Sequence, residues 1–372
     1  MHDKAKEVIN DLLAKADIKL QGDNPWDIQV KNDAFYSRVL ATGSMALGES
    51  YMDGWWQVED MAEFFNRLMI ADLDEKVRED KRLLFDLLKS KLFNLQSKKR
   101  ARRSGEHHYN IGNELYKNML DKSMTYTCGY WATADNLDQA QEDKLDLVCR
   151  KIGLKAGDKV MDIGSGWGSF AKFAAEKYGA TVVGYNVSSE QVKLSRELCQ
   201  GLPVEFKLQD YREATEKVDH IVSLGMIEHV GYKNYRQYMK VAARCLSDNG
   251  LFLLHTIGIN KSTTHIDPWI DKYIFPNSML PSIKQLSAAF EGLFVVEDWH
   301  NFGVYYDRTL LAWYDNFSKN WDKIKNDYDD RFFRMWKFYL LASAGSFRSR
   351  KNQLWQIVLS KNGVPGGYQS IR

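Results

Sequence analysis

The clearest structural signal in this chain is the run Lys159-Val160-Met161-Asp162-Ile163-Gly164-Ser165-Gly166-Trp167-Gly168. Its first half is apolar and indicates a buried strand, and its second half is a loop with three glycines. The segment that follows, Phe170–Ala174, is predicted to continue as a helix. Glycine permits a tight turn and lets a ligand approach the backbone closely. A strand, a glycine loop and a helix in this order therefore predict a ligand-binding turn on an α/β domain.

The regions around this run alternate between short apolar segments and helical segments. Besides Lys159–Ile163, strands are predicted at Ala180–Gly184, Val204–Leu208, His220–Leu224, Leu251–His255, Leu293–Asp298 and Gln353–Leu359. Helical segments of about 10–15 residues separate most of the first five strands, which is typical of βαβ units. We therefore predict a doubly wound, mostly parallel α/β sheet, with a less regular insertion between residues 258 and 290.

The spacing of the glycines favours one cofactor over its obvious rival. NAD-binding loops read GxGxxG and hold a pyrophosphate at a helix N-terminus. This loop reads GxGxG and follows Asp162. A carboxylate beside a pyrophosphate would be repelled, but the same carboxylate suits the cationic methionine part of S-adenosylmethionine. We therefore predict that Asp162, Gly164 and Gly166 bind S-adenosylmethionine.

The acidic residue that often binds ribose hydroxyls is missing after the second predicted strand. The segment there is Val183–Gln191, in which Asn186 and Gln191 are the polar substitutes. After the third strand, Gln209–Arg212 lies where an adenine contact is expected. These residues extend the predicted cofactor site beyond the glycine loop.

Composition limits the class of protein. The 372 residues suit two or three domains, and a net charge of +2 does not indicate a nucleic-acid partner. The four cysteines form no CxxC pair, which favours a reducing compartment. Neither a secretion signal nor a run of ~20 apolar residues is present, so we expect a cytoplasmic or membrane-peripheral protein. Aromatic residues make up 13% of the chain, which fits either a large core or a site for cations or lipid chains.

Three regions are distinguished along the chain. Residues 1–79 are predicted to form a small, mainly helical N-terminal domain. Residues 80–104 combine a leucine stripe with basic side chains and end in Lys98–Arg103, where five of six residues are basic. This segment suits an anionic membrane surface, and it equally suits a helix packed on its own protein and followed by a solvated linker. Residues 105–372 are predicted to form the catalytic domain.

Several longer motifs match a known family. They are Glu106-His107-His108-Tyr109-Asn110-Ile111-Gly112-Asn113, Tyr126-Thr127-Cys128-Gly129-Tyr130-Trp131, Met226-Ile227-Glu228-His229-Val230-Gly231, His255-Thr256-Ile257-Gly258 and Asp298-Trp299-His300-Asn301-Phe302-Gly303. Together with Gly48–Trp56, they resemble the cyclopropane-fatty-acyl-phospholipid synthases. The catalytic part is also similar to mycolic acid cyclopropane synthases. The resemblance covers almost the whole chain, and this combination of motifs is highly specific.

The resemblance implies a fold and a reaction. The fold is the seven-stranded sheet of class I S-adenosylmethionine-dependent methyltransferases. The enzyme would transfer a methylene group from S-adenosylmethionine to the cis double bond of an unsaturated phospholipid acyl chain, with bicarbonate as the base. The products would be a cyclopropane ring and S-adenosylhomocysteine. The resemblance also implies membrane phospholipids as partners and a peripheral location at the cytoplasmic face of the membrane. Dimerisation through the N-terminal region is compatible with the family pattern.

The resemblance also assigns residues to the site. The catalytic positions around bicarbonate match Cys128, Glu228, His255, Ile257 and Tyr306. An isoleucine side chain has no polar atom, so Ile257 and Cys128 are expected to contribute main-chain groups. Cofactor contacts match Tyr126, Thr127, Gly164, Gly166, Asn186, Gln191, Tyr211 and Arg212.

The chain departs from the family pattern at two positions. Asn110 stands where the family usually has aspartate, and Ser343 stands where members often have cysteine. The expected mechanism has no covalent intermediate, so we predict activity with Ser343.

Three competing interpretations of the same residues remain. Cysteine, glutamate and histidine also bind zinc, but no short ligand pair is present and no metal is expected. A lipid methyltransferase that leaves a methyl branch without closing a ring would share every cofactor contact. A catalytically silent lipid-surface protein would tolerate a degraded glycine loop, whereas the loop of this chain is intact.

Overall fold

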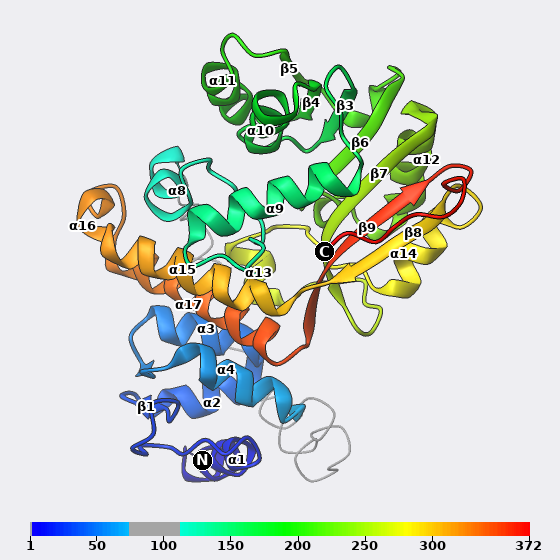
Figure 1. The fold of residues 1–372 in the computed structure, drawn as a ribbon. Helices are drawn as coiled ribbons and strands as arrows, with labels where there is room; N and C mark the ends of the chain where they lie inside the picture. Colours follow the sequence, from blue (N-terminus) through cyan, green and yellow to red (C-terminus); the bar gives the residue numbers. More distant parts are fainter. Residues whose placement is uncertain (1, 74–111) are drawn as a thin grey trace. The chain divides into compact units, whose positions relative to one another are not determined.

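The computed structural model describes residues 2–73 and 112–372 of the chain (Figure 1). The chain divides into two compact units, and each unit is built from three separate segments. Unit 1 comprises Met1–Met119, Asp267–Pro276 and Trp313–Lys351. Unit 2 comprises Leu120–Ile266, Asn277–Ala312 and Asn352–Arg372.

Unit 2 contains a seven-stranded sheet. Its strands are β3 (Lys159–Ile163), β4 (Thr181–Asn186), β5 (Val204–Leu208), β6 (Val218–Leu224), β7 (Leu246–Ile259), β8 (Val295–Asn301) and β9 (Asn352–Ser360). Their order across the sheet is β5-β4-β3-β6-β7-β9-β8. The pairs from β5 to β7 are parallel, whereas β9 runs antiparallel to both of its neighbours. The sheet is therefore mostly parallel, as predicted.

Helices cover both faces of this sheet (Figure 1). They are α9 (Leu137–Lys151), α10 (Ser169–Tyr178), α11 (Ser189–Leu198), α12 (Tyr235–Cys245) and α14 (Ile283–Phe290). Successive strand residues point to opposite faces. Accordingly, Val160 packs in one apolar cluster with residues of α9, α10 and α11, and Met161 packs in another with residues of α12 and α14. This arrangement confirms the doubly wound α/β sheet.

Several strands are longer than the sequence pattern predicted, and two of these extensions, in β4 and β7, bear on the site. Strand β4 continues to Asn186, because that residue still pairs with Leu208 of β5. Strand β7 extends through His255 to Ile259, because β9 pairs with it along this whole length. His255, the last residue of the predicted strand, therefore lies within β7. In the predicted insertion, α13 (Pro268–Tyr273) belongs to unit 1, and α14 belongs to unit 2.

Unit 1 is mainly helical, as predicted for the N-terminal region. Its helices include α1 (His2–Ala14), α2 (Ala34–Thr42), α3 (Ser44–Met52), α4 (Met61–Ile70), α8 (Asn113–Met119), α13, α16 (Trp321–Ile324) and α17 (Asp330–Arg348). Two short strands, β1 (Gln29–Val30) and β2 (Trp56–Gln57), pair antiparallel. Helix α15 (Val304–Lys319) begins in unit 2 and ends in unit 1.

The core of unit 1 is aromatic. The Phe338 ring of α17 lies 5.2 Å from the Phe65 ring of α4 and 4.5 Å from the Trp269 ring of α13. Close approach of α17 to α4 depends on Gly345, because an added Cβ would lie 2.6 Å from the Ala62 carbonyl oxygen. Unit 1 thus accounts for part of the high aromatic content as ordinary core.

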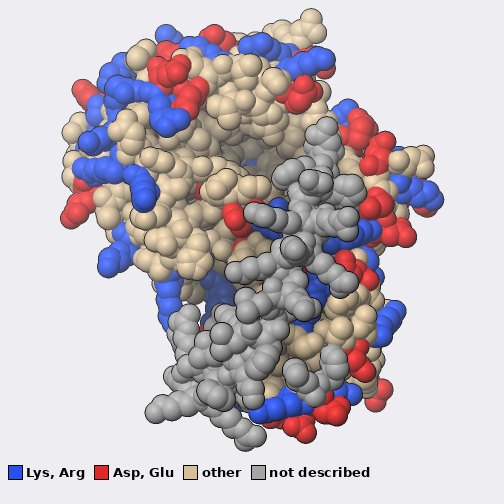
Figure 2. Space-filling model, turned by 180° about the vertical axis from the view of Figure 1, so that it is seen from behind, with Lys and Arg blue, Asp and Glu red and all other residues tan. Residues whose placement is uncertain are grey.

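Some sequence predictions fall on residues that the structure does not describe. These are the basic segment 80–104 with Lys98–Arg103, the position Asn110, and most of the motif that begins at Glu106. The proposed domain limits at 79 and 104 lie in the same stretch and stay predictions. Within residues 2–73 and 112–372, no helix is both long and apolar enough to cross a membrane. Over the face shown in Figure 2, basic and acidic side chains are interspersed, in keeping with the net charge of +2.

Candidate active site

The glycine loop connects β3 to α10 and adopts a conformation that favours glycine. Gly164, Gly166 and Gly168 have φ angles of +87°, +52° and +85°, a region that other residues rarely adopt. The backbone N–H groups of Gly164 and Ser165 donate to the Tyr185 carbonyl of β4, at 3.0 and 3.2 Å. A Cβ atom at Gly166 would meet nothing within 4 Å. The loop is therefore fixed on the strand side and open at Gly166, as close approach of a ligand requires.

Asp162 is buried at the end of β3, with 2% of its surface exposed. Its carboxylate accepts no hydrogen bond from the described residues. Burial raises the pKa of the Asp162 carboxyl to about 7, and the nearby positive charge of Lys144 acts against this rise. An ionised Asp162 would thus be a buried anion that lacks a hydrogen-bonded partner, which suits a cationic ligand.

The end of β4 contributes two of the predicted cofactor residues. The Asn186 side-chain amide donates to the Gly166 carbonyl at 3.1 Å and to the Gln191 side-chain oxygen at 3.0 Å. Helix α11 begins here and is capped by Ser188, whose hydroxyl accepts from the Gln191 backbone. The fold therefore brings Asn186 and Gln191 directly to the glycine loop.

The two predicted adenine contacts that follow β5, Tyr211 and Arg212, lie in different surroundings. Tyr211 is buried, and its ring makes an edge contact with the Tyr238 ring at 5.4 Å between centroids. The Arg212 guanidinium pairs with the Asp210 carboxylate at 2.6 and 2.9 Å, and more than half of its side chain is exposed. Tyr211 thus has a defined place beside the sheet, whereas Arg212 lies in a surface ion pair.

The segment before Cys128 passes close to the strand ends. A Cβ atom at Gly225, which follows β6, would lie 2.9 Å from Cγ2 of Thr127. Helix α9 holds this segment from the other side, because the Gln141 amide donates to the Thr127 carbonyl at 2.7 Å. Tyr126 and Thr127 are both half-buried. Thr127 therefore lies near the same edge of the sheet as the glycine loop.

Three of the predicted catalytic residues meet at the ends of β6 and β7. The Ile257 backbone N–H donates to Oε1 of Glu228 at 2.7 Å. The second carboxylate oxygen, Oε2, and Nε2 of His255 are both buried and have no hydrogen-bond partner among the described residues. Nδ1 of His255 lies 3.3 Å from the Gln356 amide nitrogen of β9. Two buried polar atoms are thus left for a ligand to satisfy.

Burial also sets the charge of these groups. It raises the pKa of the Glu228 carboxyl to about 7, and the hydrogen bond from Ile257 only partly opposes that rise. Burial lowers the pKa of His255 well below its ordinary value, and the positive charges of Lys144 and Lys151 add to this effect. The site therefore contains a neutral imidazole and a carboxyl group that ionises near neutral pH.

Cys128 and Tyr306 belong to the same unit as this group. Cys128 is fully buried, and the Thr309 hydroxyl of α15 lies 3.8 Å from its sulfur. The same hydroxyl accepts from the Gly129 backbone N–H at 3.1 Å. Tyr306 is also buried and lies one helical turn before Thr309, on the same side of α15. Burial raises the pKa of the Cys128 thiol far above its ordinary value, so the thiol stays protonated and its backbone remains the expected contributor.

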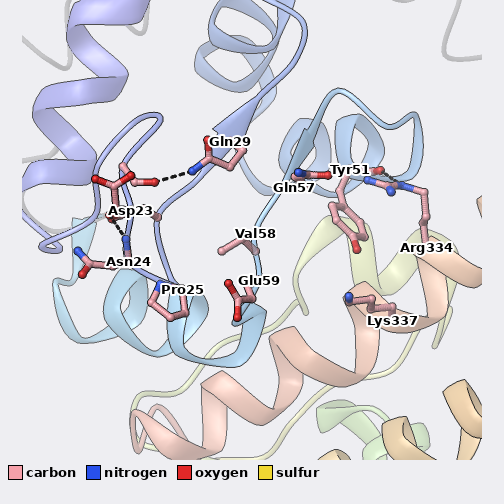
Figure 3. Close-up of a pocket in the computed structure, with 12 residues that line it drawn as sticks. Asp23, Asn24, Pro25, Gln29, Tyr51, Gln57, Val58, Glu59, Arg334 and Lys337 are labelled. Carbon is pink, nitrogen blue, oxygen red and sulfur yellow. Dashed lines mark hydrogen bonds between the residues drawn. The ribbon is translucent and has the colours of Figure 1, made fainter.

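Elsewhere, the described residues contain a polar cleft but no metal-binding cluster. Among them, His, Cys, Asp and Glu side chains form no group of three that could hold a metal ion. Unit 1 has a cleft of about 400 Å³, shown in Figure 3, which is lined by polar residues that include Asp23, Glu59, Arg334 and Lys337. Arg334 already donates to the carbonyls of Tyr51 and Trp56 there. No predicted site residue lines this cleft.

Sequence reasoning missed three residues that organise the site. Lys144 and Gln141 of α9 are fully buried and hydrogen-bond to Thr127, and Thr309 ties Gly129 to α15. A signal was available for the first two. Both occupy positions on the buried face of α9, beside the apolar residues Ala140, Leu145 and Val148. Polar side chains at such positions are unusual and point to a buried partner.

Comparisons with known proteins give a consistent result. The family described as mycolic acid cyclopropane synthetase matches residues 96–357. The cyclopropane-fatty-acyl-phospholipid synthase of Escherichia coli (strain K12) is 49% identical over 365 residues, which are 98% of this chain and 95% of that protein. The tuberculostearic acid methyltransferase UfaA1 of Mycobacterium tuberculosis is 30% identical over 355 residues, which are 90% of this chain and 82% of that protein.

A solved structure shares the fold. The crystal structure of the mycolic acid cyclopropane synthase CmaA1, complexed with SAH and CTAB, matches with a TM-score of 0.64 and 28% sequence identity. The match covers 68% of this chain and 96% of that chain.

Proposed function

Because the chain belongs to the mycolic acid cyclopropane synthetase family, we propose that it is a cyclopropane-fatty-acyl-phospholipid synthase. It transfers a methylene group from S-adenosylmethionine to the cis double bond of an unsaturated phospholipid acyl chain. Family membership and the likeness to CmaA1 establish the coarser statement, an S-adenosylmethionine-dependent methyltransferase with the class I fold. The phospholipid substrate and the roles of the site residues are part of what we propose.

The chemistry explains why the site needs both a cofactor loop and a base. An alkene carbon attacks the methyl group of the sulfonium, a C–C bond forms, and the C–S bond breaks with its electrons going to sulfur. This leaves a positive centre on the acyl chain. A base must then remove a proton from the transferred methyl group, so that the second C–C bond closes the ring. Aromatic rings near the site, such as Phe302 at 6.0 Å from the His255 ring, suit such a cation.

The observation that carries the proposal is the pair of buried polar atoms, Oε2 of Glu228 and Nε2 of His255, which no described residue satisfies. A small anion that both accepts and donates hydrogen bonds fits between a carboxylate and an imidazole. Bicarbonate has this character, and when bound it would supply the base that the ring closure requires.

The chain's own residues define how such an anion is held. Ile257 fixes one oxygen of Glu228 through its backbone N–H, so the second oxygen has a set direction and can accept the hydroxyl proton of the anion. If the Gln356 amide donates to Nδ1 of His255, Nε2 carries the proton and can donate to the anion. Cys128 contributes backbone groups, and Tyr306 contributes a buried hydroxyl on the neighbouring helix.

The proposal includes where the enzyme works. An acyl double bond lies inside a bilayer, so the enzyme acts as a peripheral protein on membranes that contain unsaturated phospholipids. We place it at the inner face of the membrane, with the basic run Lys98–Arg103 as the contact to anionic lipids. A homodimer is compatible with this arrangement.

One experiment tests the reaction. The protein is incubated with S-adenosylmethionine, bicarbonate and vesicles of an unsaturated phospholipid, and the acyl chains are analysed by mass spectrometry and proton NMR. We expect a gain of one CH₂ per converted chain together with the far-upfield methylene protons of a cyclopropane ring. Unchanged acyl chains, with folded protein and intact cofactor, would refute the proposal.

The same experiment separates the second candidate function. UfaA1, a relative at 30% identity, is named as a methyltransferase, so a methyl branch is a real alternative product. A branched chain would show a new methyl doublet and no ring protons. The groups proposed to hold the base are all present here, namely Glu228, His255 and Tyr306, and they favour ring closure.

A further inference from the structure

Helix α9 carries two fully buried lysines, and only one of them has an acidic partner. Lys151 lies 3.5 Å from the Asp298 carboxylate and 3.0 Å from Nδ1 of His300. Lys144, about two turns earlier, makes no ion pair with any described residue. Its ammonium donates a hydrogen bond to the Thr127 hydroxyl at 2.9 Å. Burying a charge without a paired partner costs several kcal/mol, so packing alone does not explain Lys144.

Four charged or titratable groups act electrostatically with Lys144. They are Asp121 and Cys128 in the preceding loop, Asp162 on β3 and His255 on β7. Val160 and Leu253 pack in the apolar cluster that includes α9 residues. Asp162 and His255 follow them by two positions on their strands, so they point to the α9 face as well.

Of the two carboxylates in this group, Asp162 is the one that accepts no hydrogen bond from the described residues. The Asp121 carboxylate is already satisfied, because it accepts the backbone N–H groups of Ser123 and Thr125 at 2.9 and 2.8 Å. The Asp162 carboxylate accepts none from the described residues, and Lys144 is the cation whose charge acts on it. The Asp162 carboxylate is therefore left to bind a cationic group of the ligand.

The hydrogen bond to Thr127 also has a direction. An ammonium is only a donor, so Lys144 occupies an acceptor position on the Thr127 oxygen. The hydroxyl proton of Thr127 must then point to a different acceptor. Thr127 lies beside Gly225 at the ends of the strands, where a ligand at the glycine loop would present its amino-acid end.

We propose that Lys144 is a positioning residue for the methyl donor, which sets the Thr127 hydroxyl as a donor to the cofactor's carboxylate. The amino-acid end of S-adenosylmethionine carries one group of each sign, so a hydroxyl donor and a carboxylate complement it. This inference rests on the proposed use of S-adenosylmethionine at this loop. Lys144 acts through Thr127 and does not contact the reacting atoms.

Binding of S-adenosylhomocysteine, which has the same amino-acid end, tests the inference by calorimetry. Lys144→Met and Thr127→Val should each weaken binding by about tenfold to a hundredfold, as expected when a hydrogen bond to a charged group is lost. The double variant should bind no more weakly than the worse single variant, because both changes remove one interaction. Lys151→Met is the matched control, a buried lysine of the same helix, and should change Kd by less than about twofold.

The pH dependence gives a second readout that packing alone would not produce. Burial lowers the pKa of Lys144 to about 8. The ammonium is therefore present below that pH and is lost as the pH rises through it, so Kd for S-adenosylhomocysteine should rise above about pH 8. Arginine stays charged over this range, so Lys144→Arg should lose this part of the rise. The amino group of the ligand itself also titrates, but it does so equally with the parent protein and with Lys144→Arg, so it does not affect the comparison.

The outcomes are distinguishable. If the parent protein does not bind S-adenosylhomocysteine, the proposed cofactor use itself fails. If the parent binds and folded Lys144→Met binds equally well, only the inference is overturned. An equally large loss in Lys151→Met would overturn it too, because a general packing defect would then explain the effect. If Lys144→Met does not fold, Thr127→Val decides, and an unchanged Kd in that variant overturns the inference.

Discussion

At the scale of single residues, Glu228 shows how position changes the chemistry of a side chain. One oxygen of its carboxylate accepts the Ile257 backbone N–H, and the second has no partner among the described residues. Burial raises the pKa of Glu228 to about 7, far from the usual range of a glutamate. A carboxylate in this state is suited to hold the proton of a small anion near neutral pH.

Replacing Glu228 tests its role directly. Glu228→Gln keeps the shape and the acceptor for Ile257 but removes the charge. We expect ring formation to fall by about two orders of magnitude or more, the usual range for a group that supports proton transfer. Affinity for S-adenosylhomocysteine should stay within about twofold, since Glu228 lies outside the glycine loop. Ring formation by the variant at the rate of the parent would contradict the proposed role of Glu228 in ring closure.

The raised pKa of Glu228 predicts that the stability of the protein depends on pH, and Glu228→Gln tests this dependence. The pKa of Glu228 in the folded protein is raised from 4.5 to about 7, so folding favours its protonated form. This contribution is complete below pH 4.5 and is lost as the pH rises through about 7. Glu228→Gln should therefore be more stable than the parent at pH 8, by up to about 3 kcal/mol, and the difference should vanish near pH 4. Denaturant unfolding at both pH values measures it.

Ser343 tests whether the reaction needs a thiol in the C-terminal helix. The residue lies half-buried on α17 in unit 1, where its carbonyl accepts the Ser346 hydroxyl at 2.7 Å. The proposed chemistry has no covalent intermediate, so Ser343→Ala should retain most of the turnover in the vesicle assay. Complete loss of turnover in a folded variant would contradict the mechanism.

At the scale of elements, the glycine loop joins a buried strand to a helix and leaves one side free. Gly164 and Ser165 are held by the Tyr185 carbonyl, and Asn186 holds the Gly166 carbonyl. All of these groups come from β4 or the loop itself. The loop is therefore fixed by its neighbour strand before any ligand binds, which reduces the entropy cost of binding.

Two single alanine substitutions, Gly166→Ala in the loop and Gly153→Ala outside it, separate the effect of backbone strain from that of ligand contact. Gly166 has φ of +52° and Gly153, after α9, has φ of +64°, and a Cβ at either position would meet nothing within 4 Å. Both alanine variants should lose about 1 kcal/mol of stability, the cost of a left-handed alanine. Only Gly166→Ala should also weaken S-adenosylhomocysteine binding, by about tenfold, because its Cβ enters the space left for the ligand. Equal Kd values for the two variants would place the ligand elsewhere.

At the scale of the whole molecule, the proposed reaction needs a soluble cofactor and a lipid that stays in its bilayer. The described surface carries both signs of charge, as the face in Figure 2 shows. The concentrated basic run is Lys98–Arg103, which lies outside the described residues and is known from the sequence. A cluster of this kind is attracted to anionic lipids by about 1 kcal/mol per basic residue.

Charge reversal tests that run. Replacing the five basic residues of Lys98–Arg103 with glutamate should abolish most binding to vesicles rich in anionic lipid. Binding of S-adenosylhomocysteine should stay unchanged, which serves as the control for folding. The parent's vesicle binding should also weaken as salt is added, because charge attraction at a surface is screened. Vesicle binding that is unaffected by the reversal would mean that the segment is only a linker.

The sequence by itself determined the sheet, the glycine loop and the family. Strand positions follow from apolar runs, and the loop follows from glycine spacing, because both signals are local in the chain. Glu228, His255 and Ile257 were named from motifs, and the structure places them together. Family resemblance supplied that set, since nothing local in the sequence relates residue 228 to residue 257.

Only the tertiary structure decided how the site is supported and charged. The helical pattern places Lys144 on the apolar face of its helix, but only the structure shows its hydrogen-bond partner, the Thr127 hydroxyl. Arg212, which the resemblance assigns to the cofactor site, forms a surface ion pair with Asp210, and its role as a cofactor contact stays a prediction. The pKa values of Asp162 and Glu228 rise because the protein removes water from around them. Desolvation and charge pairing depend on which segments meet in space, so a linear pattern of residues does not contain them.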